Sequence, residues 1–158
     1  MNWQQITGRW NRLAGLVRES WTKPLRGALY RLRSTADLPR VLDAVTAPMP
    51  ACGYAERDVF AVRLALGEAV VNALKHGNAG DPTKEVRVRW RVTAAEVLAE
   101  VADEGPGFDP GRVPDPTAPE NLERPGGRGL LLMRHYVTHV RYNDRGNAVT
   151  LCHRRSGR

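Results

Sequence analysis

Residues 64–78 read LALGEAVVNALKHGN, and this stretch decides the fold. It lies in a predicted helix from Glu56 to Lys75, which is followed by a stop at His76-Gly77-Asn78. Glu68 and Asn72 stand four residues apart and therefore stack on one face, with Lys75 one turn further. The opposite face is apolar and consists of Val59, Val62, Leu66, Val70 and Ala73. The polar face either points into a site above the helix or is an ordinary solvated face.

A second motif, Asp103-Glu104-Gly105-Pro106-Gly107, follows the end of a predicted strand. An aspartate at a strand tip can accept a hydrogen bond from an exocyclic amine such as that of adenine. Two glycines at a spacing of two remove the Cβ atoms that would hold a flat ring away from the backbone. A tight turn without a ligand explains the same residues, because Asp-x-Gly also serves turns.

A third motif, Gly126-Gly127-Arg128-Gly129, precedes a short apolar helix from Gly129 to Tyr136. Glycines allow several backbone N–H groups to converge on a phosphate, and a helix N-terminus adds partial positive charge. Arg128 can pair with a terminal phosphate. A flexible linker explains the same glycines, and the chain has no Gly-x-x-x-x-Gly-Lys-Ser/Thr phosphate loop.

The remaining patterns predict one α+β domain, a two-layer sandwich of a mixed, mostly antiparallel sheet with helices on one face. A further helix is predicted from Leu38 to Met49, and five prolines within residues 109–125 exclude a long regular element there. The short links at 93–95 and 144–147 predict two hairpins. The predicted strands are Ala28–Arg33, Val86–Val92, Glu96–Asp103, Val140–Asn143 and Ala148–His153.

The order of these motifs resembles the Bergerat-fold ATPases over residues 29–153. That resemblance implies ATP and Mg²⁺ as cofactors, with Asn72 as the metal ligand, Glu68 as the general base and Asp103 as the reader of adenine. Residues 109–125 become the lid over the phosphates, and Thr150 supports adenine, often through water. The residues expected to hold ATP are Asn72, Lys75, Asp103, Gly105, Gly107, Gly126, Gly127, Arg128, Gly129, Leu130 and Thr150.

Within that superfamily the chain is similar to the bacterial anti-sigma factor serine/threonine kinases. The similar stretches are residues 64–78, 103–110, 126–133 and 140–151. The resemblance implies a cytoplasmic, homodimeric partner switch that binds a sigma factor and phosphorylates a serine or threonine of an antagonist protein. A regulator of the same fold that binds ATP without phosphorylating anything explains the same motifs. Transducer domains of gyrase or chaperone type do not fit in 158 residues, and residues 1–55 contain no phosphoacceptor histidine.

Most of the net charge of +7 belongs to the N-terminal segment. Residues 1–33 hold seven basic residues and one acidic residue, whereas the rest of the chain holds 17 and 16, which argues against a DNA-binding core. Residues 1–26 are predicted to be a basic amphipathic extension, 27–154 the ATPase domain and 155–158 a basic tail. Cys52 and Cys152 match no metal spacing and are expected to be reduced.

The extension carries an apolar stripe at helical spacing: Trp3, Ile6, Trp10, Leu13, Val17 and Trp21. This stripe fits an anionic membrane surface, a protein partner, a homodimer seam or packing against its own domain. A disordered tail is a further alternative. The start of the chain does not have the apolar run and cleavage site of a secretory signal.

Overall fold

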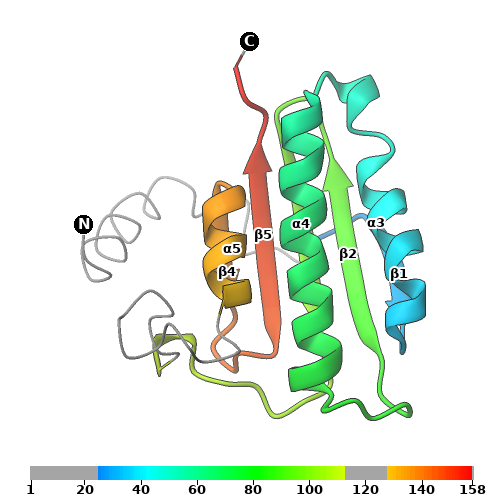
Figure 1. The fold of residues 1–158 in the computed structure, drawn as a ribbon, viewed down its shortest axis with the longest axis vertical. Coiled ribbons are helices and arrows are strands. Elements are labelled where there is room, and N and C mark those ends of the chain that lie inside the picture. Colours follow the sequence, from blue (N-terminus) through cyan, green and yellow to red (C-terminus); the bar gives the residue numbers. More distant parts are fainter. Residues whose placement is uncertain (1–24, 113–127, 158) are drawn as a thin grey trace.

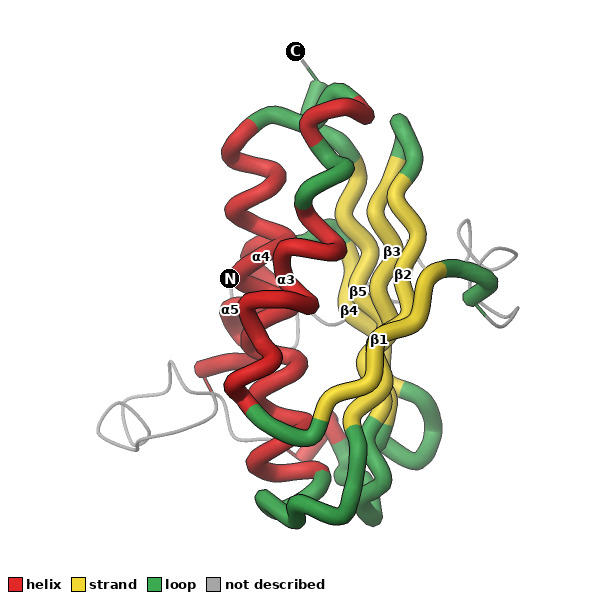
Figure 2. The backbone as a smooth tube through the Cα atoms, turned by 90° about the vertical axis from the view of Figure 1, so that its right-hand side faces the viewer, coloured by secondary structure: helices red, strands yellow, loops and turns green. Residues whose placement is uncertain are grey.

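A single sheet with helices on one side makes up the fold (Figures 1 and 2). The computed structural model describes residues 25–112 and 128–157. Five strands lie in the order β1-β2-β3-β5-β4, and every neighbouring pair is antiparallel, so the expected mixed sheet is antiparallel throughout this part of the chain. The short hairpin links leave no room for a parallel crossover between β2 and β3 or between β4 and β5. The strands are β1 (Ala28–Leu32), β2 (Val86–Val92), β3 (Glu96–Ala102), β4 (His139–Tyr142) and β5 (Ala148–Arg154).

The two faces of the sheet differ because side chains alternate along each strand. Val86 and Val88 of β2 are buried against the helices, whereas Arg87 and Arg89 point to the other side. In the described ranges no helix lies on that other side, as Figure 2 shows. We call it the open face, and its residues include Leu29, Arg87, Arg89, Arg91, Glu96, Leu98, Glu100, Arg141, Thr150 and Cys152.

Three helices cover the sheet: α3 (Leu38–Thr46), α4 (Glu56–Asn72) and α5 (Arg128–Tyr136). α4 lies in the middle and packs against both others, and their apolar sides join the strands in one hydrophobic core. α3 ends three residues before the predicted Met49 because Pro48 and Pro50 donate no backbone hydrogen bond. Short 3-10 turns occur at Thr35–Asp37, Pro50–Cys52 and Pro110–Arg112.

The predicted helix up to Lys75 changes character before it ends. α4 stops at Asn72 and continues as a π-helical turn, Ala73–Gly77. The wider turn is closed by the Asn78 N–H, which donates to the Ala73 carbonyl at 2.8 Å. A π turn contains one more residue than an α turn, so it rotates the following side chains relative to an ideal α-helix.

A buried polar cluster lies at the opposite end of α4. Asp58 is 1% exposed and accepts hydrogen bonds from the Ala55 N–H at 3.2 Å and from the Ser156 hydroxyl. The His153 ring nitrogen Nε2 lies 3.0 Å from the same carboxylate. Ser156 belongs to the predicted basic tail, so this cluster ties the end of the chain to the first turn of α4.

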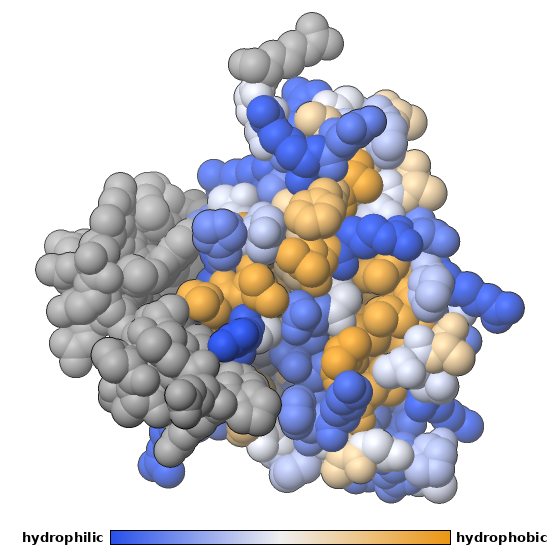
Figure 3. Space-filling view, in the orientation of Figure 1, coloured by the Kyte–Doolittle hydropathy of each residue, from blue (hydrophilic) through white to orange (hydrophobic). Residues whose placement is uncertain are grey.

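The surface on the helix side is mixed. Apolar side chains occur there as separate patches among hydrophilic ones (Figure 3). No helix of the described ranges has the length and apolar composition that crossing a bilayer requires. Cys52 and Cys152 are free thiols, as expected. The predicted helix at 2–21, Gly126, Gly127 and most of the predicted lid lie outside the described residues.

Candidate nucleotide site

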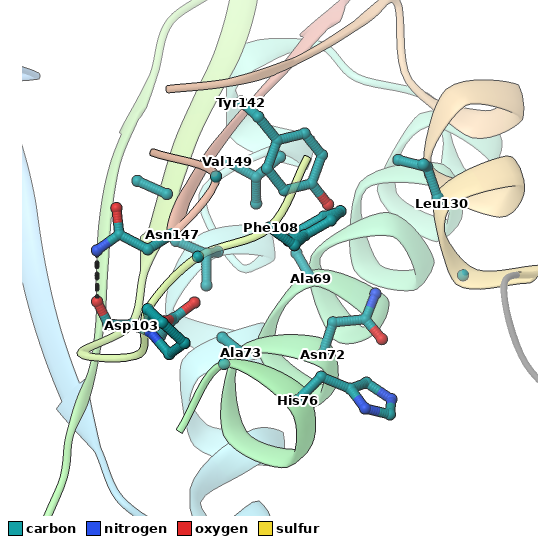
Figure 4. Close-up of a pocket in the computed structure, with 17 residues that line it drawn as sticks. Ala69, Asn72, Ala73, His76, Asp103, Phe108, Leu130, Tyr142, Asn147 and Val149 are labelled. Atoms are coloured by element: carbon teal, nitrogen blue, oxygen red, sulfur yellow. Dashed lines mark hydrogen bonds between the residues drawn. The ribbon is translucent and has the colours of Figure 1, made fainter. Parts of the chain in front are cut away.

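A cavity of about 270 Å³ opens between the end of α4, the start of α5 and the loops that follow β3 and precede β5. Its volume is close to the lower end of the range for small-molecule sites, roughly 300–1,000 Å³. Figure 4 shows Asn72 and His76 on one side, Asp103 and Asn147 on another, and Leu130 across from them. Three segments that are far apart in the sequence thus meet at one cavity.

Asp103 is the buried acidic group of this cavity, with 9% of its surface exposed. Its backbone is fixed by Asn147, whose carbonyl accepts from the Asp103 N–H at 2.9 Å and whose side-chain amide donates to the Asp103 carbonyl at 3.2 Å (Figure 4). The Gly105 N–H donates to Oδ1 at 2.8 Å. Loss of solvation raises the pKa of Asp103, and the Gly105 hydrogen bond and Arg145 offset only part of that effect. Within the described residues Oδ2 accepts no hydrogen bond, so it remains available to a ligand.

Two glycines permit the close approach of loops around Asp103. A Cβ atom at Gly77 would lie 2.3 Å from the Asp103 carboxyl carbon. A Cβ atom at Gly105 would lie 2.0 Å from the Gly77 carbonyl oxygen. Gly105 therefore supports the carboxylate from behind, whereas Pro106 and Gly107 line the cavity itself. The two glycines of this loop thus have different roles: Gly105 permits the loops to pack closely, and Gly107 forms part of the cavity wall.

The loop after β3 and the turn before β5 interlock. Gly107 and Gly146 both have positive φ angles, 82° and 75°, and each backbone lies against the other loop. Arg145 donates to the Gly105 carbonyl at 3.2 Å, and the rings of Phe108 and Tyr142 pack edge to face with centroids 5.0 Å apart. Burial raises the pKa of Tyr142 to about 12, so its hydroxyl is protonated at neutral pH. Neither Arg145 nor Tyr142 was predicted to belong to the site. Each contacts the loop after β3, and contacts between residues so far apart in the sequence leave no local pattern.

At the other end of the cavity, Gly129 lies against the polar face of α4. A Cβ atom at Gly129 would lie 2.7 Å from Glu68 Oε2 and 3.1 Å from Asn72 Nδ2. Asn72, Gly129 and Leu130 line the cavity, and Glu68 stands next to it. Arg128 is the first residue of α5 and is exposed. The predicted pair of Glu68 and Asn72 is therefore adjacent to the glycine of the third motif.

Two expected ATP-holding residues lie elsewhere. Lys75 is exposed and does not line the cavity, because the π turn brings its neighbour His76 to that side instead. Thr150 stands between the core residues Val149 and Leu151 of β5, so it points to the open face. Instead of Thr150, the four residues that precede it line the cavity: Gly146, Asn147, Ala148 and Val149.

The sequence profile of the histidine kinase-like ATPase domain matches residues 33–153. The chain belongs to this family. The match includes both the α4 polar face and the loop after β3, so this ATPase domain accounts for all described parts of the cavity.

Curated relatives of this ATPase domain are protein kinases by name. It is 32% identical to the serine/threonine-protein kinase BtrW of Bordetella bronchiseptica over 58% of this chain and 68% of that protein. It is 34% identical to the serine-protein kinase RsbW of Bacillus licheniformis over 63% of this chain and 66% of that protein.

A solved structure shares the fold. The crystal structure of the RsbU and RsbW domains of a Mycobacterium tuberculosis protein superimposes with a TM-score of 0.52 at 17% sequence identity. The similarity covers 81% of this chain and 32% of that one. It therefore supports the α+β arrangement of sheet and helices.

Proposed function

We propose that this domain is an anti-sigma-type serine/threonine kinase that binds Mg-ATP in the cavity and phosphorylates an antagonist protein. The observation that carries the proposal is the meeting of Asn72, Asp103 and Gly129 at one cavity. These residues come from α4, the loop after β3 and the start of α5. The names of the relatives, serine-protein kinase RsbW and serine/threonine-protein kinase BtrW, support the same reaction.

The Asp103 end of the cavity suits adenine. Oδ2 can accept from the exocyclic amine, while Gly105 keeps Oδ1 in place through its backbone hydrogen bond. Gly107 lines the cavity without a side chain, which allows a flat ring to approach. Phe108 and Tyr142 add aromatic surface on the same side of the cavity.

The Asn72 end suits the phosphates and a magnesium ion. Mg²⁺ retains waters and takes few protein ligands, so one amide oxygen together with phosphate oxygens satisfies it. The absence of a Cβ atom at Gly129 leaves space directly in front of Glu68 and Asn72. Mg-ATP, when bound, would supply the γ-phosphoryl group and leave as Mg-ADP, and Glu68 would accept the proton that the attacking hydroxyl loses.

The partners in this proposal are a sigma factor and an anti-sigma-factor antagonist protein, with a homodimer as the assembled form. The chain spans about two thirds of the length of the curated kinases that it matches. ATP binding alone does not establish that the antagonist is phosphorylated, because a regulator that only binds ATP has the same cavity.

The decisive experiment separates these two activities. Glu68→Gln should keep ATP affinity while transfer of labelled phosphate to candidate antagonist domains falls by about 10²-fold or more. Glu56→Gln, an exposed substitution of the same type in the first turn of α4, is the matched control and should leave both activities unchanged. If wild-type protein binds ATP but labels no partner, the domain is a binding regulator and the kinase assignment is wrong.

A second experiment examines the metal. Asn72→Ala should weaken Mg-ATP binding by roughly tenfold or more, measured by calorimetry, because the metal loses its protein ligand. In EDTA the variant and the wild type should bind ATP almost equally. Unchanged Mg-ATP affinity in the variant would refute the role of Asn72.

A further inference from the structure

The cavity offers few polar side chains to a ligand. Five of its described lining residues have one: Asn72, His76, Asp103, Tyr142 and Asn147. Asn72 and His76 come from α4 and its π turn and lie together on one side (Figure 4). Asn147 is already engaged, because its side-chain amide donates to the Asp103 carbonyl and accepts within its own turn. On the sheet side of the described cavity, the polar groups left for a ligand are therefore the Asp103 carboxylate and the Tyr142 hydroxyl.

The hydroxyl of Tyr142 makes no hydrogen bond within the part of the chain that the structure describes. It is also not enclosed, since the enclosed polar side-chain atoms without a partner are Asn78 Nδ2 and His153 Nδ1. Figure 4 shows the ring of Tyr142 directed into the cavity with the hydroxyl at its inner end. The edge-to-face contact with Phe108 holds the ring in this direction. Tyr142 thus presents an unused polar atom to the cavity.

The register of the sheet relates Tyr142 to Asp103. Tyr142 of β4 lies opposite Val149 of β5, and Val149 lies opposite Val101 of β3. All three residues line the cavity. Asp103 follows two residues after Val101, so its side chain is on the same side of the sheet. β3 and β4 are two strand spacings apart, roughly 10 Å, so a flat ring bound over this row can contact both Asp103 and Tyr142.

The two groups have complementary hydrogen-bonding capacities. Oδ2 of Asp103 accepts, whereas the Tyr142 hydroxyl can donate because its pKa of about 12 keeps it protonated at neutral pH. Adenine needs both, since its exocyclic amine donates and its ring nitrogens accept.

We propose that the Tyr142 hydroxyl donates a hydrogen bond to a ring nitrogen of adenine and is the second group that reads the base. This inference rests on the proposed function, because it takes the cavity to be an ATP site. Thr150, the hydroxyl residue expected to support adenine, points to the open face and cannot make this contact. Tyr142 supplies a hydroxyl from the neighbouring strand β4 instead.

Tyr142→Phe tests this bond, because it removes the hydroxyl and keeps the ring that packs on Phe108. Calorimetry on the full chain should show Mg-ATP affinity reduced about 3- to 10-fold, the range of one neutral hydrogen bond. The urea midpoint without ligand should equal that of the wild type, because the hydroxyl has no described partner to lose. Tyr30→Phe is the matched control. Tyr30 is a partly buried tyrosine of β1 that does not line the cavity, so its variant should bind ATP within about twofold of the wild type.

Adenine analogues identify the contacted atom. The 1-deaza, 3-deaza and 7-deaza forms of ATP each replace one ring nitrogen with a C–H group that accepts no hydrogen bond. One of the three should bind the wild type more weakly than ATP by about the factor seen for Tyr142→Phe, and the variant should no longer distinguish it from ATP. Equal ATP affinity of wild type and variant would overturn the inference, as would an effect of Tyr142→Phe that is the same on ATP and on all three analogues. A wild type that binds no ATP would show that the proposed function is wrong and would remove this inference with it.

Discussion

Two buried aspartates lie near opposite ends of α4 and have opposite environments. Asp58 belongs to the first turn of α4, whereas Asp103 follows β3 and faces the cavity at the other end of the helix. Asp58 receives hydrogen bonds from Ser156, His153 and the Ala55 N–H, and these outweigh its loss of solvation and lower its pKa. Among the described residues, the Asp103 carboxylate receives one hydrogen bond, from Gly105, and loss of solvation raises its pKa. One carboxylate is therefore satisfied by the protein itself, whereas the other keeps an unused acceptor that faces a cavity.

This difference distinguishes a structural group from a binding group. A buried carboxylate that is fully hydrogen-bonded stabilises the fold, and removing it leaves its partners unsatisfied. A buried carboxylate with an unused acceptor is a cost to the unliganded fold that a ligand can offset. The same change, aspartate to asparagine, should therefore have opposite consequences at the two positions.

The largest effect is expected at the structural position. Asp58→Asn should lower the free energy of unfolding by about 2–4 kcal/mol, because an amide group replaces an acceptor for the Ala55 N–H and the pairing with His153 is weakened. Urea unfolding at pH 7 measures this change. ATP affinity should remain within about twofold because the site lies beyond the other end of α4. A variant of wild-type stability would remove the distinction between the two carboxylates.

The next effect concerns ligand binding. Asp103→Asn should weaken ATP binding by roughly 10- to 100-fold, because a charged acceptor of the adenine amine is lost while the Gly105 hydrogen bond can persist. Calorimetry measures the affinity. Without ligand, the unfolding free energy should equal or exceed that of the wild type, since burial of a charge is removed. A clear loss of stability would mean that Asp103 is a structural group as well.

Ser156→Ala should have a smaller effect. It removes one of the hydrogen bonds to Asp58 and should cost about 1 kcal/mol. A urea titration compared with that of Asp58→Asn measures it. If Ser156→Ala costs as much as Asp58→Asn, the whole C-terminal segment detaches when this single contact is lost.

The smallest effects are expected in the pH dependence of stability. The lowered pKa of Asp58 gives a contribution that is complete above the unfolded value, about 3.9, and is lost as the pH falls through the folded pKa. The raised pKa of Asp103 acts in the opposite sense, because the folded state takes up its proton first as the pH falls. Urea midpoints between pH 7 and 3 should therefore fall less steeply in Asp58→Asn and slightly more steeply in Asp103→Asn. Identical slopes in both variants would contradict the assigned shifts.

Much of the fold follows from local patterns. The alternation at Val86–Val92 and the apolar stripe of α4 specify which side faces the core, and both hairpins follow from their short links. Asn72, Asp103, Gly107 and Gly129 were all predicted and meet at the cavity. Their individual roles in binding and catalysis stay predictions.

The misplaced residues have a physical explanation. Residues 73–77 continue a helical pattern, so nothing local indicates the π turn that turns Lys75 away and brings in His76. Leu151 and Cys152 are adjacent and both buried, so periodicity alone does not fix the face on which Thr150 lies. The hydrogen bond from Arg145 to the Gly105 carbonyl joins residues 40 positions apart, so no local pattern predicts it.

The π turn also determines where this segment can vary in length. It holds one residue more than an α turn, and its exit places Asn78, which is 1% exposed and accepts from the Glu104 N–H at 2.9 Å. Deleting the exposed Lys75 would convert the bond from the Asn78 N–H to the Ala73 carbonyl into that of an ordinary α turn and leave Asn78 in place. A one-residue deletion earlier in α4 would instead rotate everything downstream by about 100°. Among homologous sequences, one-residue gaps should therefore fall within Ala73–Gly77 and not earlier in α4.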